Sequence, residues 1–241
     1  MKRVLYRDLG RMGYSECWQL QSSEFERMLS QKRVRPAQCE GASMACEGSL
    51  AEEDAGQLLL VEHNPVYTLG KSGKEQNMLV SEEYLRSIGA EFFHIDRGGD
   101  ITYHGPGQIV GYPILDLEQI GIGLREYIDS IEESIIGVCA EWGIEAGRIA
   151  GASGVWLEPE TKRARKICAI GVRASRYVTM HGFAMNVNTD LKYFSHINPC
   201  GFVDRGVTSL QRELGHEVDA EVVKSQIVKH LSEKLKIEIY K

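Results

Sequence analysis

One stretch of the chain joins an unusual glycine content to a long apolar run, and it reads Arg97-Gly98-Gly99-Asp100-Ile101-Thr102-Tyr103-His104-Gly105-Pro106-Gly107-Gln108, then Ile109-Val110-Gly111-Tyr112-Pro113-Ile114-Leu115. The second half is typical of a buried strand. The first half has two interpretations. It is a tight hairpin that needs glycine for positive φ, or a loop whose backbone approaches a ligand while Arg97, Tyr103 and His104 hold the ligand's polar parts. Both can hold together.

Strand-like and helix-like patterns continue outward from this stretch. Alternating or apolar runs predict strands over residues 4–8, 58–63, 66–69, 92–97, 154–157, 166–172, 177–187 and 237–240. Helical spacing predicts helices over residues 15–32 with Ser15 as N-cap, 81–87, 123–142, and after Asp219. We interpret 123–142 as a core-packing helix without chemistry. The last helix should bury one face, made of Val222, Val223, Ile227, Leu231 and Leu235. Strands in a block, with helices before, between and after them, favour an α+β domain with mixed sheets and flanking helices over repeating βαβ units.

The chain length is compatible with one large domain. Its 241 residues can bury a substantial core without disulfides. We see no linker that would split the chain, so we expect a single catalytic domain over residues 1–241. Residues 33–56 are small, polar and acidic, which predicts a mobile insertion in which Cys39 and Cys46 are incidental.

Composition and charge exclude several classes of protein. The net charge of −6 argues against a nucleic-acid binder. The six cysteines form no C-x-x-C pair, so neither a zinc ribbon nor a thioredoxin-like motif is indicated, and we expect no metal site and mostly inert thiols. No apolar run reaches membrane-spanning length and the N-terminus lacks a signal-peptide core. We expect a cytoplasmic protein that does not bind membranes and acts as a monomer, although the sequence does not fix the oligomeric state.

Familiar catalytic and nucleotide motifs are missing from the sequence. Residues 70–74 contain a lysine between glycines but lack the Walker A spacing, and no G-x-G-x-x-G or H-E-x-x-H is present. Residues 151–154 are one residue short of the serine nucleophile elbow. The sequence therefore gives no support to nucleotide, zinc-protease or serine chemistry, and we predict no cofactor.

Two residues remain as candidates for chemistry. Cys200 lies between Pro199 and Gly201, a context typical of a turn, where a thiol can meet a substrate. An arbitrary cysteine is more often buried and structural. Lys166 begins an apolar strand after the basic run at residues 162–165, and a lysine in that position is more often solvated. The basic run is either a solvated loop or a docking patch for acidic partners.

Five motifs in order resemble the octanoyltransferase family, also called lipoyl(octanoyl) transferases or lipoate-protein ligase B. The resemblance covers most of residues 57–210. It runs through residues 61–70, the Arg97 to Gln108 stretch, Lys166-Ile167-Cys168-Ala169-Ile170-Gly171-Val172, His181-Gly182-Phe183-Ala184-Met185-Asn186-Val187-Asn188 and Ile197-Asn198-Pro199-Cys200-Gly201. Residues 33–56 and Cys168 depart from the family pattern.

The resemblance implies a reaction, its partners and its residues. The reaction is transfer of an octanoyl group from octanoyl acyl carrier protein to a lysine of a lipoyl domain, as in 2-oxoacid dehydrogenase E2 subunits and the glycine cleavage H protein. Cys200 would be the acyl-thioester nucleophile and Lys166 its activating partner. Acyl contacts would come from Arg97 to His104, from Ala169, Ile170 and Gly171, and from Gly182, Phe183 and Ala184. The fold implied is that of biotin and lipoate protein ligases.

The chemistry of these residues agrees with the resemblance. An unperturbed thiol is only a few per cent thiolate at neutral pH, and a neighbouring ammonium would lower its pKa. Lys166 can then pass a proton to the departing thiol and later take one from the acceptor amine. Small and apolar residues at 169–171 and 182–184 suit an eight-carbon chain. His104 and His181 either orient polar atoms of the substrate or are structural.

Two other functions remain open on the sequence. A ligase of the same fold would activate lipoate or biotin with ATP and would not depend on Cys200. A non-enzymatic acyl- or metal-binding module would use Cys200, His196 and His181, although their spacing is poor evidence for a metal site. An ATP requirement separates the first from an acyltransferase, and bound zinc would favour the second.

Overall fold

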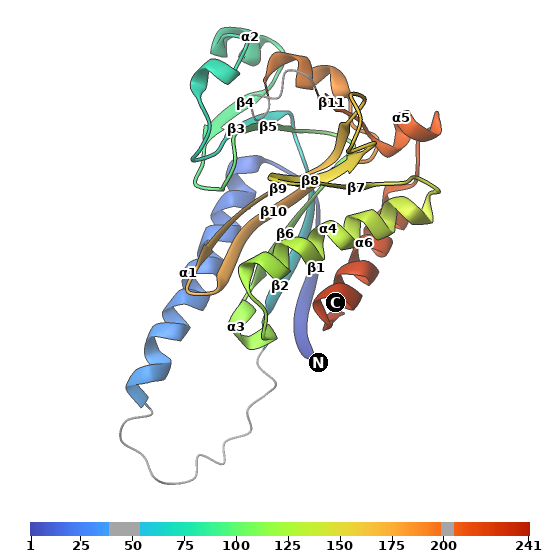
Figure 1. The fold of residues 1–241 in the computed structure, drawn as a ribbon. Helices are drawn as coiled ribbons and strands as arrows, with labels where there is room; N and C mark the ends of the chain where they lie inside the picture. The colour runs from blue at the N-terminus through green and yellow to red at the C-terminus, as the bar shows by residue number, and fades with distance from the viewer. Residues whose placement is uncertain (39–53, 199–204) are drawn as a thin grey trace.

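The computed structural model describes residues 1–38, 54–198 and 205–241, without the side chains of residues 33–38. Cys200, Cys39 and Cys46 lie outside the described residues. A mixed sheet crosses the molecule (Figure 1), and its described strands follow the order β12-β1-β2-β6-β10-β9-β8-β7, with β11 beside β9. These strands are β1 Lys2–Met12, β2 Gly56–His63, β6 Gln108–Leu115, β7 Gly147–Ile149, β8 Ala152–Leu157, β9 Arg165–Ser175, β10 Val178–Asn186, β11 Gly206–Val207 and β12 Ile237–Tyr240.

The sheet is parallel at one edge and antiparallel through its centre. β1 pairs in parallel with both β12 and β2, whereas β2, β6, β10, β9, β8 and β7 pair antiparallel in succession. Central strands β2, β6 and β10 are buried along almost their whole length. Their buried residues are mainly apolar, although β10 also buries Thr179, His181 and Asn186.

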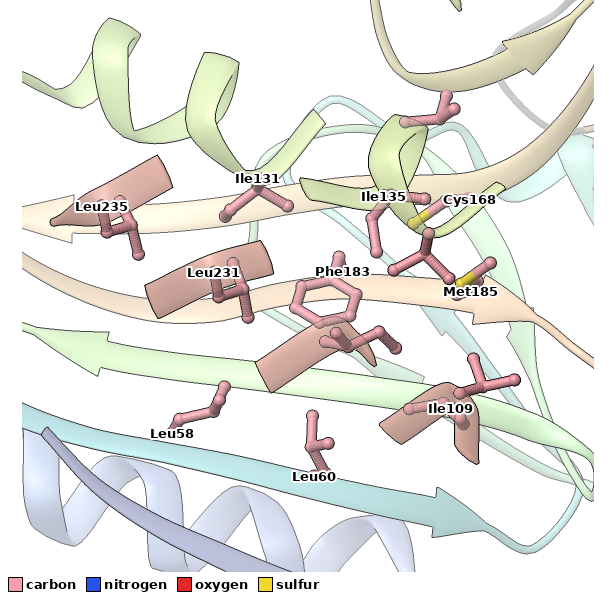
Figure 2. Packing of buried hydrophobic residues seen from close by; sticks show 14 of the residues in the cluster. Leu58, Leu60, Ile109, Ile131, Ile135, Cys168, Phe183, Met185, Leu231 and Leu235 are labelled. Carbon is pink, nitrogen blue, oxygen red and sulfur yellow. The ribbon is translucent and has the colours of Figure 1, made fainter. Parts of the chain in front are cut away.

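Helices cover both faces of this sheet (Figure 1). Helix α1, Tyr14–Gln38, packs on one face, while α4, Leu124–Glu141, and α6, Ala220–Leu235, pack together on the other. Figure 2 shows the core under α4 and α6, where Ile131 and Ile135 of α4 and Leu231 of α6 approach the strands. Apolar side chains from β2, β6, β9 and β10 complete that core, among them Leu58, Leu60, Ile109, Cys168, Phe183 and Met185.

A second, smaller sheet extends from the end of the large one. It has the order β4-β3-β5, formed by Val66–Leu69, Glu91–His94 and Ile101–His104 as β3, β4 and β5. Helix α2, Glu82–Ser87, begins at the Ser81 cap and lies on this unit. The remaining short elements are η1 Glu75–Asn77, α3 Leu117–Ile120, η2 Leu191–His196 and α5 Leu210–Leu214. The result is the predicted α+β domain with mixed sheets and flanking helices.

Several element predictions are confirmed and others are corrected. Helices 81–87 and 123–142 and the C-terminal strand occur where the pattern predicts them, and Asp219 caps α6 through the Glu221 N–H. Helix α1 starts at Tyr14, so Ser15 lies inside the helix and is not its cap. Val222 is 44% exposed, unlike the other four apolar residues predicted on its face. The spacing of apolar residues defines the buried face of a helix only to within about one residue, and Val222 lies at the edge of that face.

The predicted insertion at residues 33–56 is wrong at both of its ends. Residues 33–38 continue α1, and Gly56 already begins β2. Four of these six residues, Arg33, Arg35, Ala37 and Gln38, are strong helix formers, and the prediction gave them too little weight against Pro36. The mobility predicted for residues 39–53 concerns a segment outside the described residues. Among the described helices, none is both long and apolar enough to cross a bilayer.

Candidate active site

A cavity of about 620 Å³ lies where the loop before β5 meets β9, β10 and the start of α4. Most of the residues singled out from the sequence line it, although up to 87 positions separate them along the chain. They are Arg97, Gly98, Gly99, Asp100, Ile101, Thr102, His104, Lys166, Ala169, Ile170, Gly171, His181, Gly182, Phe183 and Ala184. The fold thus brings three of the five sequence motifs to one cavity wall.

Two of the predicted acyl-binding segments form consecutive pairs of a single antiparallel ladder. Gly171 pairs with Gly182, Ile170 with Phe183, and Ala169 with Ala184. Cross-strand partners on one face of a sheet lie within about 5.5 Å of each other at Cβ. Because neighbouring pairs alternate between the two faces of the sheet, Ile170 and Phe183 face opposite to the other four residues, and all six line the cavity.

The glycine-rich loop packs directly on this ladder. The Gly98 N–H donates to the carbonyl of Val172 at 3.0 Å. A Cβ added at Gly171 would lie 2.8 Å from the Gly98 oxygen and 3.2 Å from Cδ of Arg97. Glycine is needed at position 171 because two segments of backbone meet there, not because its φ is positive.

Arg97 holds the loop in place. Its Nη2 donates to the carbonyl and hydroxyl oxygens of Thr68 at 2.8 and 3.0 Å, and its Nη1 donates to the Gly98 carbonyl at 3.0 Å. The side chain is buried while still lining the cavity. Asp100 also stabilises the loop, because its carboxylate accepts from Asn77 Nδ2 at 2.6 Å and from the Ile101 N–H at 2.7 Å.

Tyr103 is the predicted ligand residue that the structure does not bring to the cavity. It is buried on the opposite side of β5, with its ring stacked on Tyr193 at 4.7 Å and close to Tyr67. Its neighbours Thr102 and His104 do line the cavity. Successive side chains of a strand alternate between faces, which accounts for the difference.

His104 belongs to a buried chain of hydrogen bonds. Gln108 donates from Nε2 to Asn186 Oδ1 at 2.8 Å, so its Oε1 accepts from His104 Nδ1 at 2.8 Å. Asn186 in turn donates to the Thr208 carbonyl at 3.0 Å. This order places the His104 proton on Nδ1 and leaves Nε2 as an acceptor. Burial lowers the pKa of His104 to about 3, so the ring is neutral at neutral pH.

A second buried histidine supports the same wall. His63 is fully buried, and its Nε2 lies 2.8 Å from the hydroxyl of Tyr112, a residue of the cavity lining. Burial lowers the pKa of His63 to about 4, although a hydrogen bond with the Met12 carbonyl opposes the shift. Tyr14 stacks on His104 at 6.1 Å and also lines the cavity.

His181 is held by an acidic partner. Its Nε2 lies 2.9 Å from Asp96 Oδ1, and Arg173 pairs with the other carboxylate oxygen of Asp96. Burial lowers the pKa of His181 against the opposing effect of Asp96, while the hydrogen bond from His181 lowers the pKa of Asp96. Nδ1 of His181 is buried and has no hydrogen-bond partner among the described residues. The sequence motif contained His181 but not Asp96 or Arg173.

The Lys166 side chain makes two defined contacts at the cavity wall. Its Nζ donates to the Ser153 carbonyl at 3.2 Å and lies 4.5 Å from the centre of the Trp156 ring. The Arg205 guanidinium lies over the same ring at 5.5 Å. Lys166 is partly buried, while its hydrogen bond to Ser153 is exposed to solvent.

Two of the neighbouring basic residues are occupied by ion pairs. Arg165 donates to Glu213 at 2.6 and 2.7 Å, and it contacts Glu158, which also binds Arg163 at 2.7 Å. These pairs neutralise much of the positive charge that a docking patch at residues 162–165 would need. Lys162 is exposed.

The sequence interpretation missed part of the cavity wall. Leu124 and Ile128 of α4 line it, so the helix assigned only to core packing also forms the site, and Leu124 is 40% exposed. Tyr14, Tyr112 and Trp156 were likewise not predicted. The sequence placed Leu124 on the apolar face of the helix, and nothing local marked it or the three aromatic residues as part of a cavity.

The described free cysteines are poor nucleophiles. Cys17, Cys139 and Cys168 are all buried, and burial raises the pKa of Cys17 and Cys139 to about 12 and that of Cys168 further. Cys168 packs in the core under α4, so it does not compete for a substrate in the cavity. The described segments contain no cluster of histidine, cysteine and acidic residues that could hold a metal ion. His196 contacts the Tyr67 hydroxyl instead.

Comparisons with known proteins agree with one another. Residues 42–232 match the model of the lipoyl protein ligase A/B catalytic domain. An octanoyltransferase of Bacteroides fragilis is 55% identical over 218 residues, which cover 90% of this chain and 91% of the relative. An octanoyltransferase of Flavobacterium johnsoniae is 50% identical over 239 residues, with 99% of each chain covered.

Solved structures show the same fold at low sequence identity. A bipartite lipoate protein ligase of Thermoplasma acidophilum has a TM-score of 0.68 and 16% identity, and the match covers 100% of this chain and 86% of that one. Lipoate-protein ligase A bound with ATP has a TM-score of 0.60 and 16% identity, with 77% and 74% covered.

Proposed function

The chain belongs to the lipoyl protein ligase A/B family as an octanoyltransferase, and from that premise we propose the donor, intermediate and acceptor of its reaction. The donor is octanoyl acyl carrier protein, the intermediate is an octanoyl thioester on Cys200, and the acceptor is a lysine of a lipoyl domain. All three go beyond what family membership alone establishes.

In the first half-reaction the Cys200 thiolate attacks the carbonyl carbon of the donor thioester. A new carbon–sulfur bond forms to Cys200, the bond to the donor sulfur breaks, and Lys166 gives its proton to the departing thiolate. The lysine ammonium also favours the thiolate form of Cys200 before the attack. Lys166 is then neutral.

In the second half-reaction the acceptor amine attacks the Cys200 thioester. An amide bond forms, the bond to Cys200 breaks, and neutral Lys166 takes the proton that the amine loses. The thiolate and the ammonium are thereby restored. Conversion of a thioester into an amide is downhill, so the sequence of steps needs no nucleotide.

The observation that carries this proposal is the continuous wall between Lys166 and the acyl-binding ladder. The six residues at 169–171 and 182–184 line one cavity, and Lys166 lies on the same strand only three residues before Ala169. Val207 of β11 pairs with Lys166 of β9, so the chain also returns to Lys166 shortly after Cys200. Both features support a reacting centre at the Lys166 end of the cavity.

The acyl chain would lie along the apolar part of this wall. Ile170, Phe183, Leu124 and Ile128 all contribute to it. One methylene contributes only about 1 to 3 kcal/mol to discrimination in such a pocket, so we expect a graded preference for chain length around eight carbons.

The test is a transfer reaction without ATP. Octanoyl acyl carrier protein and a lipoyl domain are mixed with wild-type protein, and the mass of the lipoyl domain is followed. We expect octanoylation by wild type and by Lys162→Ala, an exposed neighbouring lysine that serves as the control, but not by Cys200→Ser or Lys166→Ala. Transfer only in the presence of ATP and free acid would instead identify an ATP-dependent ligase.

A further inference from the structure

We propose that Glu132 of α4 is a positioning residue for Lys166, and that it acts through the peptide unit between Ser153 and Gly154. This inference rests on the proposed role of Lys166 in acyl transfer. It assigns a function to a buried carboxylate in a helix that otherwise only packs and lines the cavity.

The contacts form a continuous chain from the carboxylate to the ammonium. Glu132 Oε1 accepts from the Gly154 N–H at 2.9 Å, and the Ser153 carbonyl accepts from Lys166 Nζ at 3.2 Å. The carbonyl and the N–H belong to the same peptide bond. Because a trans peptide is planar with these two groups on opposite sides, fixing one of them fixes the direction of the other.

The carboxylate is itself held firmly. Its side chain is only 7% exposed, and Arg148 donates from Nε to Glu132 Oε2 at 2.6 Å. Arg148 also pairs with Glu133 at 2.7 Å. A buried carboxylate with both oxygens engaged has a fixed position, so its hydrogen bond to Gly154 has a fixed direction.

The geometry at position 154 excludes any residue except glycine. Gly154 has φ +119, and an added Cβ would lie 2.5 Å from the Cys168 carbonyl oxygen and 3.5 Å from Cε of Lys166. The backbone turns sharply there while touching the strand that carries Lys166. This conformation directs the Ser153 carbonyl at the lysine.

A carboxylate that accepts from the N–H of a peptide makes the carbonyl oxygen of the same peptide a stronger hydrogen-bond acceptor. Hydrogen bonds in series polarise one another, and the negative charge of Glu132 also acts directly on the ammonium. Opposing charge comes from Arg205, which lies over the same Trp156 ring as Lys166. The buried thiol of Cys168 is neutral. Glu132 therefore favours the charged form of Lys166 and holds it over the Trp156 ring.

The variant Glu132→Gln tests this with little change of shape. The amide oxygen can still accept from Gly154, and Arg148 keeps Glu133 as a partner, but the charge is lost. Glu133→Gln is the matched control, since it removes the same charge one residue away from a side chain that is 43% exposed and contacts Arg148. The readout is the pH titration of the Lys166 side-chain nitrogen, followed by NMR with isotopically labelled lysine and assigned with Lys166→Met.

We expect the titration midpoint of Lys166 to fall by about one pH unit in Glu132→Gln and to stay unchanged in Glu133→Gln. The alkaline limb of the octanoyl uptake rate should move in the same direction, with little change in KM for the donor. An unchanged midpoint in a folded Glu132→Gln protein would overturn the proposal. Should that variant not fold, Glu132→Gln with Arg148→Gln is compared with Arg148→Gln alone, and an unchanged Lys166 midpoint between these two proteins would overturn the proposal.

The two claims fail in different ways. If wild-type protein takes up no octanoyl group while the Lys166 midpoint still shifts in Glu132→Gln, the acyl-transfer role is wrong and the positioning role stands. If wild type is acylated and the midpoint does not shift, the acyl-transfer role stands and Glu132 has no effect on Lys166.

Discussion

Replacing Gly171 by alanine tests how the glycine-rich loop is seated on the acyl-binding ladder. The new Cβ would lie 2.8 Å from the Gly98 oxygen, closer than real Cβ atoms approach, and 3.2 Å from Cδ of Arg97. The first contact is with backbone, so the loop itself must move. Movement would also stretch the hydrogen bond from Gly98 to Val172. Overpacking costs about 1 to 3 kcal/mol and a hydrogen bond about 1, so we expect a loss of about 2 to 4 kcal/mol.

The assay is urea unfolding, combined with the kinetics of octanoyl transfer under conditions where both proteins are folded. We expect KM for the octanoyl donor to rise more than kcat falls, because the displaced loop lines the cavity. Gly13→Ala, where an added Cβ meets nothing within 4 Å, and Gly206→Ala, where it meets only Arg165 Cβ at 3.6 Å, are the controls. A Gly171→Ala protein as stable as these controls would refute the close packing of the glycine-rich loop on β9.

Three further outcomes are expected. The histidines His63 and His104 have folded-state pKa values of about 4 and about 3, below the unfolded value of 6.5. At a pH between the folded and unfolded pKa values, the unfolded state therefore binds more protons than the folded state. Stability should therefore be complete above about pH 6.5 and fall on acidification, by about 2 kcal/mol per histidine at about pH 5, and His63→Gln should reduce this slope in urea unfolding. Lys166→Ala should shift the pH profile of Cys200 alkylation to higher pH, and an unchanged profile would contradict its activating role. Cys168→Ala should leave the number of thiols titrated by a disulfide reagent in the native protein unchanged, because Cys168 is fully buried.

Local patterns in the sequence were enough to predict most elements and much of the cavity. The spacing of apolar residues in α4 and the caps at Ser81 and Asp219 are local features, and the structure has them. The family motifs also contained many, but not all, of the residues that line the cavity. Strand alternation alone would have placed Tyr103 on the face opposite Thr102 and His104, so that difference was readable in advance.

Other features depend on contacts that no local pattern records. Asp96 and His181 lie 85 residues apart and meet only when the small sheet packs on β10. The same holds for the hydrogen bond between Glu132 and Gly154, because α4 must dock beside β8 before it forms. Pairing of Gly171 with Gly182 likewise follows from the register of a turn at residues 176–177, where both residues have positive φ.

The intact mass of the enzyme itself tests the central claim most directly. Wild-type protein and Cys200→Ser are each incubated with octanoyl acyl carrier protein, without ATP and without an acceptor. The account predicts one octanoyl adduct on wild type that hydroxylamine removes, and none on Cys200→Ser. An adduct of equal amount on both proteins, or none on wild type while the lipoyl domain is still octanoylated, would contradict a thioester intermediate at Cys200.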